Sequence, residues 1–104
     1  MMKPIDRQTV LSAVESFLGV QVYVHFEAPG SIFRNALCVF SEAGIKGEGP
    51  YRLALRSKDG SVWIRMEGLI DYDVDEQGRL FIAEHDDVGR LIRGVTLSRH
   101  PLSF

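Results

Sequence analysis

Residues 51–67, YRLALRSKDGSVWIRME, decide the fold, because they predict two strands joined by a tight turn. Asp59-Gly60 lies at the centre of this stretch, and this dipeptide is typical of two-residue β-hairpin turns. A turn at this point fixes the register of both strands, and alternate side chains of each strand then share a face. On the face predicted to be buried, the register gives two apolar cross-strand pairs: Leu55 with Ile64, and Leu53 with Met66.

The opposite face of this hairpin is polar. It pairs Arg56 with Trp63, for which we predict a cation over an aromatic ring. It also pairs Arg52 with Glu67, for which we predict a cross-strand ion pair. A single register therefore gives one apolar and one polar face, as expected for an antiparallel sheet with one side in the core.

The sequence before the hairpin predicts two further strands. Apolar and polar residues alternate over residues 20–27, which indicates a half-buried strand. Pro29-Gly30-Ser31 predicts a turn, and residues 32–41 form a second, nearly continuous apolar strand. Residues 42–50 contain three glycines and a proline, so we expect a loop or an irregular edge there.

The N-terminal residues predict a helix. Asp6 is a suitable N-cap, and Gly19 is a natural stop after the last apolar residue. Between these two positions, apolar residues recur at helical spacing: Val10, Leu11, Val14, Phe17 and Leu18. We expect this helix to cover one face of the sheet.

Downstream of the hairpin, residues 75–80 (DEQGRL) are echoed by residues 86–91 (DDVGRL). In each segment an acidic residue opens a turn and a glycine supplies the left-handed conformation near its end. Two such turns predict an antiparallel meander with strands near residues 68–74, 80–85 and 91–98.

These elements predict a single domain, residues 1–104, of the α+β class and mainly β. A chain of 104 residues has the usual length of one domain. The expected architecture is an N-terminal helix packed on an antiparallel, strongly curled sheet or barrel of about seven short strands.

Composition argues against several functional classes. The net charge is −2, so the chain lacks the basic excess typical of nucleic-acid binders, and no nucleic-acid partner is expected. No apolar stretch approaches the length of a membrane span, so we expect no membrane association. The single cysteine, Cys38, cannot form an internal disulfide, and we interpret it as a buried free thiol. These features predict a cytoplasmic location.

One acidic pattern resembles a calcium-binding loop. The residues at the template's spacing are Asp73, Asp75, Gln77, Gly78, Leu80 and Glu84, with Asp73, Asp75 and Glu84 as the oxygen ligands of a metal ion. The flanking segments read as strands, whereas this template requires helices. The preferred interpretation is therefore a solvated acidic β-turn, and no cofactor is expected.

The histidines offer a different hypothesis. His25, His85 and His100 have no recognised metal-binding spacing. His25 shares one face of the strand at residues 20–27 with Tyr23 and Glu27, which is compatible with a binding site. The alternative function is a small metal-dependent or acid–base enzyme that uses His25, His85 and nearby carboxylates.

Several stretches resemble the YojF family of small bacterial proteins, whose function is uncharacterised and which occur mainly in Bacillus-like organisms. They occur in order along nearly the whole chain: VYVHFE (22–27), FRNA (33–36), GEGPYR (47–52), EGL (67–69) and VDEQGRL (74–80). The resemblance implies a compact β-rich domain that forms a homo-oligomer. It also implies a gene position near that of a zinc-dependent deacetylase of bacillithiol synthesis. The chain departs from the family between Ala28 and Ile32, where we expect several members to carry a longer polar insertion with histidines.

The leading hypothesis is a non-enzymatic accessory protein that binds a ligand or a partner. We expect a homodimer and, from the family resemblance, a protein partner in bacillithiol synthesis. No catalytic residue is singled out. The predicted binding residues are Tyr23, His25, Glu27, Arg34, Arg52, Trp63 and Glu67.

Overall fold

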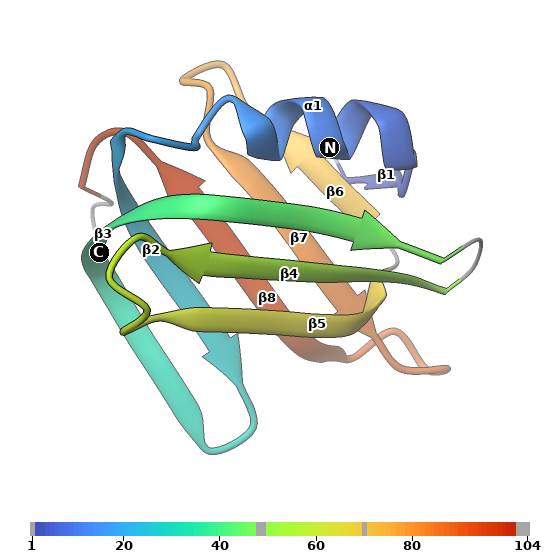
Figure 1. Cartoon of the computed structure of the whole chain (residues 1–104). Coiled ribbons are helices and arrows are strands. Elements are labelled where there is room, and N and C mark those ends of the chain that lie inside the picture. Colours follow the sequence, from blue (N-terminus) through green and yellow to red (C-terminus); the bar gives the residue numbers. More distant parts are fainter. Residues whose placement is uncertain (1, 48–49, 70, 102–104) are drawn as a thin grey trace.

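The structure is a computed structural model that describes residues 2–47, 50–69 and 71–101 (Figure 1). These residues form a mainly β fold with one helix, α1 (Arg7–Glu15), as the sequence predicts. The strands in chain order are β1 (Lys3–Pro4), β2 (Gln21–Ala28), β3 (Ser31–Lys46), β4 (Tyr51–Ser57), β5 (Trp63–Leu69), β6 (Asp71–Val74), β7 (Leu80–His85) and β8 (Leu91–Ser98).

The described strands form one antiparallel sheet in the order β1-β6-β7-β8-β2-β3-β4-β5. In this part of the chain β1 and β5 are the two ends of the order, so the sheet is open and the predicted barrel is wrong. The strand count also exceeds the predicted seven because β1, which pairs with β6, was missed. A strand of two residues carries no alternation that a sequence pattern could reveal.

β3 folds the sheet into two layers. Its first half pairs with β2, and from Phe40 onward it pairs with β4. Figure 1 shows β3, β4 and β5 crossing in front of β2, β8 and β7. Of the two alternatives predicted over residues 42–50, a loop is wrong for residues 42–46, which continue β3 as an edge that pairs with β4 after a register shift between Phe40 and Glu42. Ile45 is buried opposite Leu53, so cross-strand packing sustains the strand there.

The core lies between the two layers. Alternate residues of β2, β4, β5, β7 and β8 point into it, in agreement with their period-two patterns. The helix contributes Val10 and Val14, and Phe17 follows just after its end. The core strand residues are Val22, Val24, Leu53, Leu55, Ile64, Met66, Leu80, Ile82, Val95 and Leu97. Burial of this apolar surface is the main force that holds the layers together.

The hairpin of β4 and β5 has the predicted register over most of its length. The ladder confirms the pairs Leu53 with Met66, Leu55 with Ile64, and Arg56 with Trp63. The register then shifts, so the ladder does not pair Arg52 with Glu67. The Glu67 carboxylate lies 3.6 Å from the Arg65 guanidinium, which itself lies 6.0 Å from the centroid of the Trp63 ring.

The turn of this hairpin is wider than the predicted two residues, because residues 58–62 separate the strands. The Asp59 carboxylate organises it by accepting hydrogen bonds from the Ser61 hydroxyl (2.6 Å), the Ser61 N–H (2.9 Å) and the Ser57 hydroxyl (2.8 Å). These hydrogen bonds lower the pKa of Asp59 to about 2. The wider turn keeps the predicted strand register because Asp59 fixes its backbone.

The helix begins as predicted and is tied to the end of β8. The Asp6 carboxylate accepts a hydrogen bond from the Thr9 N–H at 3.3 Å, which confirms the N-cap. At the other end, the Arg99 guanidinium donates to the Ser16 carbonyl and lies 4.4 Å from the centroid of the Phe17 ring. These contacts hold the helix against the sheet.

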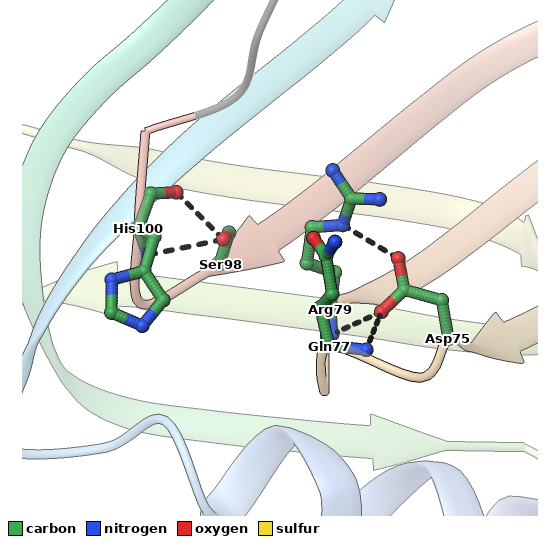
Figure 2. Close-up of polar contacts among 5 residues, drawn as sticks. All are labelled: Asp75, Gln77, Arg79, Ser98 and His100. Carbon is green, nitrogen blue, oxygen red and sulfur yellow. Dashed lines mark hydrogen bonds and ion pairs between the residues drawn. The ribbon is translucent and has the colours of Figure 1, made fainter.

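The two echoed segments form turns of the same design. In the first, the backbone N–H groups of Gln77 and Arg79 donate to Asp75 Oδ1, and Arg79 Nε donates to Asp75 Oδ2 (Figure 2). In the second, Asp86 accepts the equivalent hydrogen bonds from Val88 and Arg90. Although desolvation opposes it, this hydrogen bonding lowers the pKa of Asp75. Each carboxylate thus stabilises its own turn by accepting hydrogen bonds from the backbone N–H groups of that turn.

Glu84 belongs to a different feature, a clasp between the layers. Its side chain is 4% exposed, and its Oε1 atom accepts hydrogen bonds from the N–H groups of Glu67 (2.7 Å) and Gly68 (3.2 Å) on β5. Its Oε2 atom accepts a hydrogen bond from Arg93 Nη1 on β8 at 2.8 Å. We call this arrangement the Glu84 clasp. It satisfies backbone donors on the open edge of β5 and joins that edge to β7.

Candidate functional site

The predicted binding residues lie on two surfaces that point away from the core, one on each layer. The layer of β2, β8 and β7 carries Tyr23, His25 and Glu27, whereas the layer of β4 and β5 carries Arg52, Trp63 and Glu67. The core lies between these layers, so the structure does not bring the two sets together. The two surfaces are therefore separate candidate sites.

The first surface is the histidine groove, which we define by His25, Glu27, Phe81, His85 and Thr96. It is a depression of about 460 Å³ on the outer face of β2, β8 and β7. The register explains this convergence, because Thr96 on β8 lies opposite both His25 on β2 and Phe81 on β7. Residues at paired positions of adjacent strands point to the same face.

Small residues form the floor of the histidine groove. Gly94 lies opposite Glu27 on one side and Ala83 on the other, and the Leu91 side chain lies 3.6 Å from where a methyl group added at Gly94 would be. The Thr96 hydroxyl belongs to a residue that is 7% exposed, even though it lies on the face away from the core. The groove thus combines a floor of small residues with walls that are polar at His25, Glu27 and His85 and apolar at Met2, Phe81 and Leu91.

Two ionic contacts flank the histidine groove. His85 Nδ1 lies 3.3 Å from Asp71 Oδ1, which is the distance of an ion pair when the imidazole is protonated. Arg79, held by Asp75, also lines the groove, and its guanidinium lies 5.8 Å from the centroid of the Phe81 ring. His25 and His85 therefore line one depression but at different rows of the sheet, because His25 lies opposite Thr96 and His85 opposite Leu91 on β8.

Tyr23 and Arg34 do not line this groove. Tyr23 is one row further along β2, opposite Ser98. The Ser98 hydroxyl donates to the His100 carbonyl and accepts from the His100 N–H (Figure 2). Arg34 is exposed on β3, close to the register shift between β2 and β3.

The second surface is the tryptophan face, which we define by Lys46, Arg52, Arg56, Trp63 and Arg65. It lies on the outer side of β3, β4 and β5. Two adjoining depressions of about 430 Å³ and 270 Å³ cover it, and both contain Trp63 in their linings. Trp63 is 67% exposed, which is unusual for so large an aromatic side chain.

The floor of the tryptophan face is also built from small residues. Gly44 on β3 pairs with Ala54 on β4, which pairs with Arg65 on β5. A methyl group added at Gly44 would meet no atom within 4 Å, so the space above it is open. Carboxylates lie at two corners of the face, Glu42 and Glu67.

Sequence reasoning missed Lys46 and Arg65 on this face. Lys46 lies in the segment predicted as a loop or an irregular edge, although its alternation with the buried Ile45 is a usable signal. Arg65 follows Trp63 by two residues on the same strand and so had to share its face. The hairpin register, in contrast, predicts that Arg52, Arg56 and Trp63 share this face.

Cys38 does not add a nucleophile to either surface. It lies on β3 and is partly buried, and it lines a depression together with Val39 and Asp59. Burial and the negative charge of Asp59 raise the pKa of the Cys38 thiol. A raised pKa reduces the thiolate fraction at neutral pH, and the thiolate is the reactive form.

The structure does not assemble the calcium ligand set. Glu84 points toward the core side of β7, whereas Asp73 lies opposite Phe81 on the outer face. Asp75 is engaged in its own turn. Among the described residues, no group of three or more His, Cys, Asp or Glu side chains is placed to hold a metal ion.

No helix in the described ranges has the length and apolar character needed to cross a bilayer.

Comparison with known proteins assigns the family. Residues 28–102 match the family described as "Protein of unknown function (DUF1806)". The chain belongs to this family. It is 33% identical over 117 residues to the "Uncharacterized protein YojF" of Bacillus subtilis (strain 168), with 98% of this chain and 99% of that protein covered. The predicted resemblance to the YojF family is thereby confirmed.

A solved structure of the DUF1806 family has the same fold. The "Crystal Structure of Bacillus subtilis YojF protein" matches this chain with a TM-score of 0.85 and 36% sequence identity. The match covers 99% of this chain and 98% of the other. The open two-layer sheet is therefore shared with that relative.

Proposed function

We propose that this DUF1806 protein is a non-enzymatic binding protein whose ligand is a small polar molecule held in the histidine groove. The observation that carries the proposal is the convergence of polar side chains from β2, β8 and β7 above a floor of Ala83 and Gly94. Side chains on a solvent-facing sheet usually stand apart, whereas ligand sites gather a few polar groups around a concave surface.

The walls of the groove indicate the chemistry of the ligand. Glu27 supplies a carboxylate, Thr96 a hydroxyl, and His25 and His85 imidazole nitrogens. Such groups pair with hydroxyl, ammonium and carboxylate groups of a ligand. Met2, Phe81 and Leu91 give apolar walls beside these groups, so a molecule that carries several polar groups on an apolar skeleton fits a depression of this size best.

A second candidate function is an acid–base enzyme, and one observation favours it. The Asp71 carboxylate lies 3.3 Å from His85 Nδ1, and His85 lines the same groove as His25. A histidine held by a carboxylate is a common form of general base. The groove lining described above contains no Cys or Ser beside His85, so a reaction there would need water or the substrate itself as the nucleophile. Binding without a reaction requires no nucleophile, which is why we prefer the binding function.

The family resemblance supplies the first probe. Its implied link to bacillithiol synthesis stays a prediction, as do a protein partner in that pathway and a cytoplasmic location. Bacillithiol carries hydroxyl, ammonium and carboxylate groups, which are the groups that the groove walls pair with. It is therefore a reasonable compound to titrate first.

The test is a titration of uniformly 15N-labelled protein with bacillithiol, glucosamine or malate, followed by amide and imidazole NMR shifts. We expect shifts at His25, His85 and Thr96 with at least one probe at millimolar concentration. Glu27→Gln should weaken the binding, whereas Glu76→Gln, which changes an exposed turn carboxylate, should not. Shifts confined to residues outside the groove, or no shift with any probe, would contradict the proposal. Chemical conversion of a bound probe would instead favour the acid–base alternative.

The predicted homodimer stays part of this proposal, and β3 offers a surface for it. Ile32 and Leu37 are 54% and 51% exposed on the half of β3 that precedes its pairing with β4. Exposed aliphatic residues beside an unpaired strand edge favour strand-to-strand association. Analytical ultracentrifugation of the wild type and of Leu37→Lys tests this: the wild type should sediment as a dimer and the variant as a monomer.

A further inference from the structure

The tryptophan face has a charge opposite to that of the whole chain. Its four cations, Lys46, Arg52, Arg56 and Arg65, outnumber the two carboxylates at its corners. The chain as a whole has a net charge of −2. The face is therefore a positive surface on a negative protein, and such separation of charge attracts and orients acidic partners.

The shape of the face suits an extended segment. Its two depressions meet at Gly44, Ala54 and Trp63, so they form one continuous hollow across three strands. Arg56 lies in the depression on one side of Trp63, and Arg52 and Lys46 lie in the depression on the other side. A chain that crosses both depressions would meet cations on each side of the indole ring.

The residue types match those that dominate protein interfaces. Trp and Arg are enriched among the residues that carry most of the binding energy at such interfaces. Trp63 presents most of its surface to solvent, with the Arg65 guanidinium beside it. Gly44 and Ala54 leave room for a side chain of the partner between these anchors.

We propose that the tryptophan face is a docking surface for an acidic segment of a partner protein. Carboxylates of the segment pair with Arg52, Arg56 and Lys46, and an apolar side chain of the segment packs against Trp63. A second copy of this chain fits less well, because two copies joined through this face would oppose two surfaces of net positive charge. The proposal is independent of the histidine groove, which lies on the other layer.

Trp63 makes the test direct, because it is the only tryptophan in the sequence and its fluorescence reports on this face alone. The probe is a peptide of sequence Glu-Glu-Leu-Glu-Glu-Leu-Glu-Glu, and its control has Gln in place of every Glu. At low ionic strength we expect the acidic peptide to shift or quench the Trp63 emission with a saturable curve. The Gln peptide should bind at least tenfold more weakly, and added salt should weaken the acidic peptide.

Matched charge variants locate the binding. Arg52→Gln and Arg65→Gln should each weaken the acidic peptide several-fold. Arg90→Gln removes the same charge from the exposed β7–β8 turn and should leave the affinity unchanged. Circular dichroism of each variant confirms that it is folded.

Five outcomes would overturn the proposal. They are no change in emission with the acidic peptide, equal binding of the Gln peptide, and equal weakening by Arg90→Gln. The fourth is tighter binding of a single-stranded oligonucleotide than of the peptide, which would assign the face to nucleic acid. A change of emission with protein concentration in the absence of peptide would also overturn it, in favour of self-association.

Discussion

The histidine groove and the tryptophan face are built in the same way but differ in chemistry. Each lies on the outer side of three antiparallel strands, and each has a floor of one glycine and one alanine: Gly94 with Ala83, and Gly44 with Ala54. The walls of the groove carry both charge signs and a buried hydroxyl, whereas the tryptophan face is mostly cationic and exposed. Small residues in the middle of a sheet thus create a hollow, and the residues around it decide what the hollow can bind.

The two surfaces also differ in how firmly they are held. The groove strands are central in the sheet order, whereas β5, which carries Trp63, is an end strand. The Glu84 clasp joins β5 to β7 and so connects the layer of one surface to the layer of the other. The following predictions separate the two surfaces, from the largest expected effect to the smallest.

The largest effect is expected for the Glu84 clasp. Glu84→Ala leaves the N–H groups of Glu67 and Gly68, which are partly buried, and the Arg93 guanidinium, whose side chain is 41% exposed, without their acceptor. Removing one partner of such an arrangement should lower the free energy of unfolding by about 3 kcal/mol. Urea denaturation measures this, and Glu84→Gln, which keeps one oxygen acceptor, should lose less. A Glu84→Ala variant as stable as the wild type would show that the clasp does not join the layers.

A smaller effect is expected in the turn that supports the histidine groove. Asp75→Ala removes the acceptor of three hydrogen bonds and should cost about 1 kcal/mol. It also frees Arg79, which lines the groove, so the NMR shifts of groove residues should change. Asp86→Ala alters the equivalent turn, whose Arg90 is exposed, and should cost less and leave the groove unchanged. Equal effects of the two substitutions would contradict this difference.

The glycine floors give a matched pair of substitutions. Gly44→Ala meets no atom within 4 Å, and Gly94→Ala meets the Leu91 side chain at 3.6 Å, an ordinary contact. Each should raise the free energy of unfolding by about 0.5 kcal/mol, because alanine loses less backbone entropy on folding than glycine. Gly44→Ala should weaken the acidic peptide, whereas Gly94→Ala should not. Destabilisation by either change would contradict the open floor.

The smallest effect is expected at Asp59, which lies in the turn between β4 and β5. Its pKa is lowered to about 2 in the folded protein from an ordinary value of 3.8, so its carboxylate stabilises the fold above pH 3.8. This contribution is lost as the pH falls from 3.8 toward 2. The stability difference between wild type and Asp59→Asn should therefore shrink over that range in thermal unfolding. A difference that is constant with pH would rule out this role of the carboxylate.

The sequence predicted those parts of the fold that local patterns determine. The register of the β4–β5 hairpin, the Asp6 cap and the meander of β6, β7 and β8 follow from turn residues and alternation. The bend of β3 and the open sheet do not, because they depend on which strands meet across the core. Lys46 is not predicted as a site residue for the same reason, since a loop or irregular edge does not define which face its side chain shares.

The candidate sites could be predicted only within one hairpin. Arg52, Trp63 and Glu67 share a face because neighbouring strands place them there. His25 and His85 lie on β2 and β7, the two strands that flank β8, so they line the same depression. This arrangement can be recognised only once the sheet order is known. The role of Glu84 could not be predicted from the sequence, because its partners are backbone N–H groups on a strand that is distant in the sequence.

The central claim is that the two outer surfaces bind different partners, and one NMR measurement tests it most directly. The 15N-labelled protein is titrated with the acidic peptide described above. We predict shifts at Arg52, Ala54 and Arg65 and at the Trp63 indole N–H, with His25 and Thr96 unchanged. Shifts in the histidine groove, or shifts spread evenly over both layers, would contradict the claim.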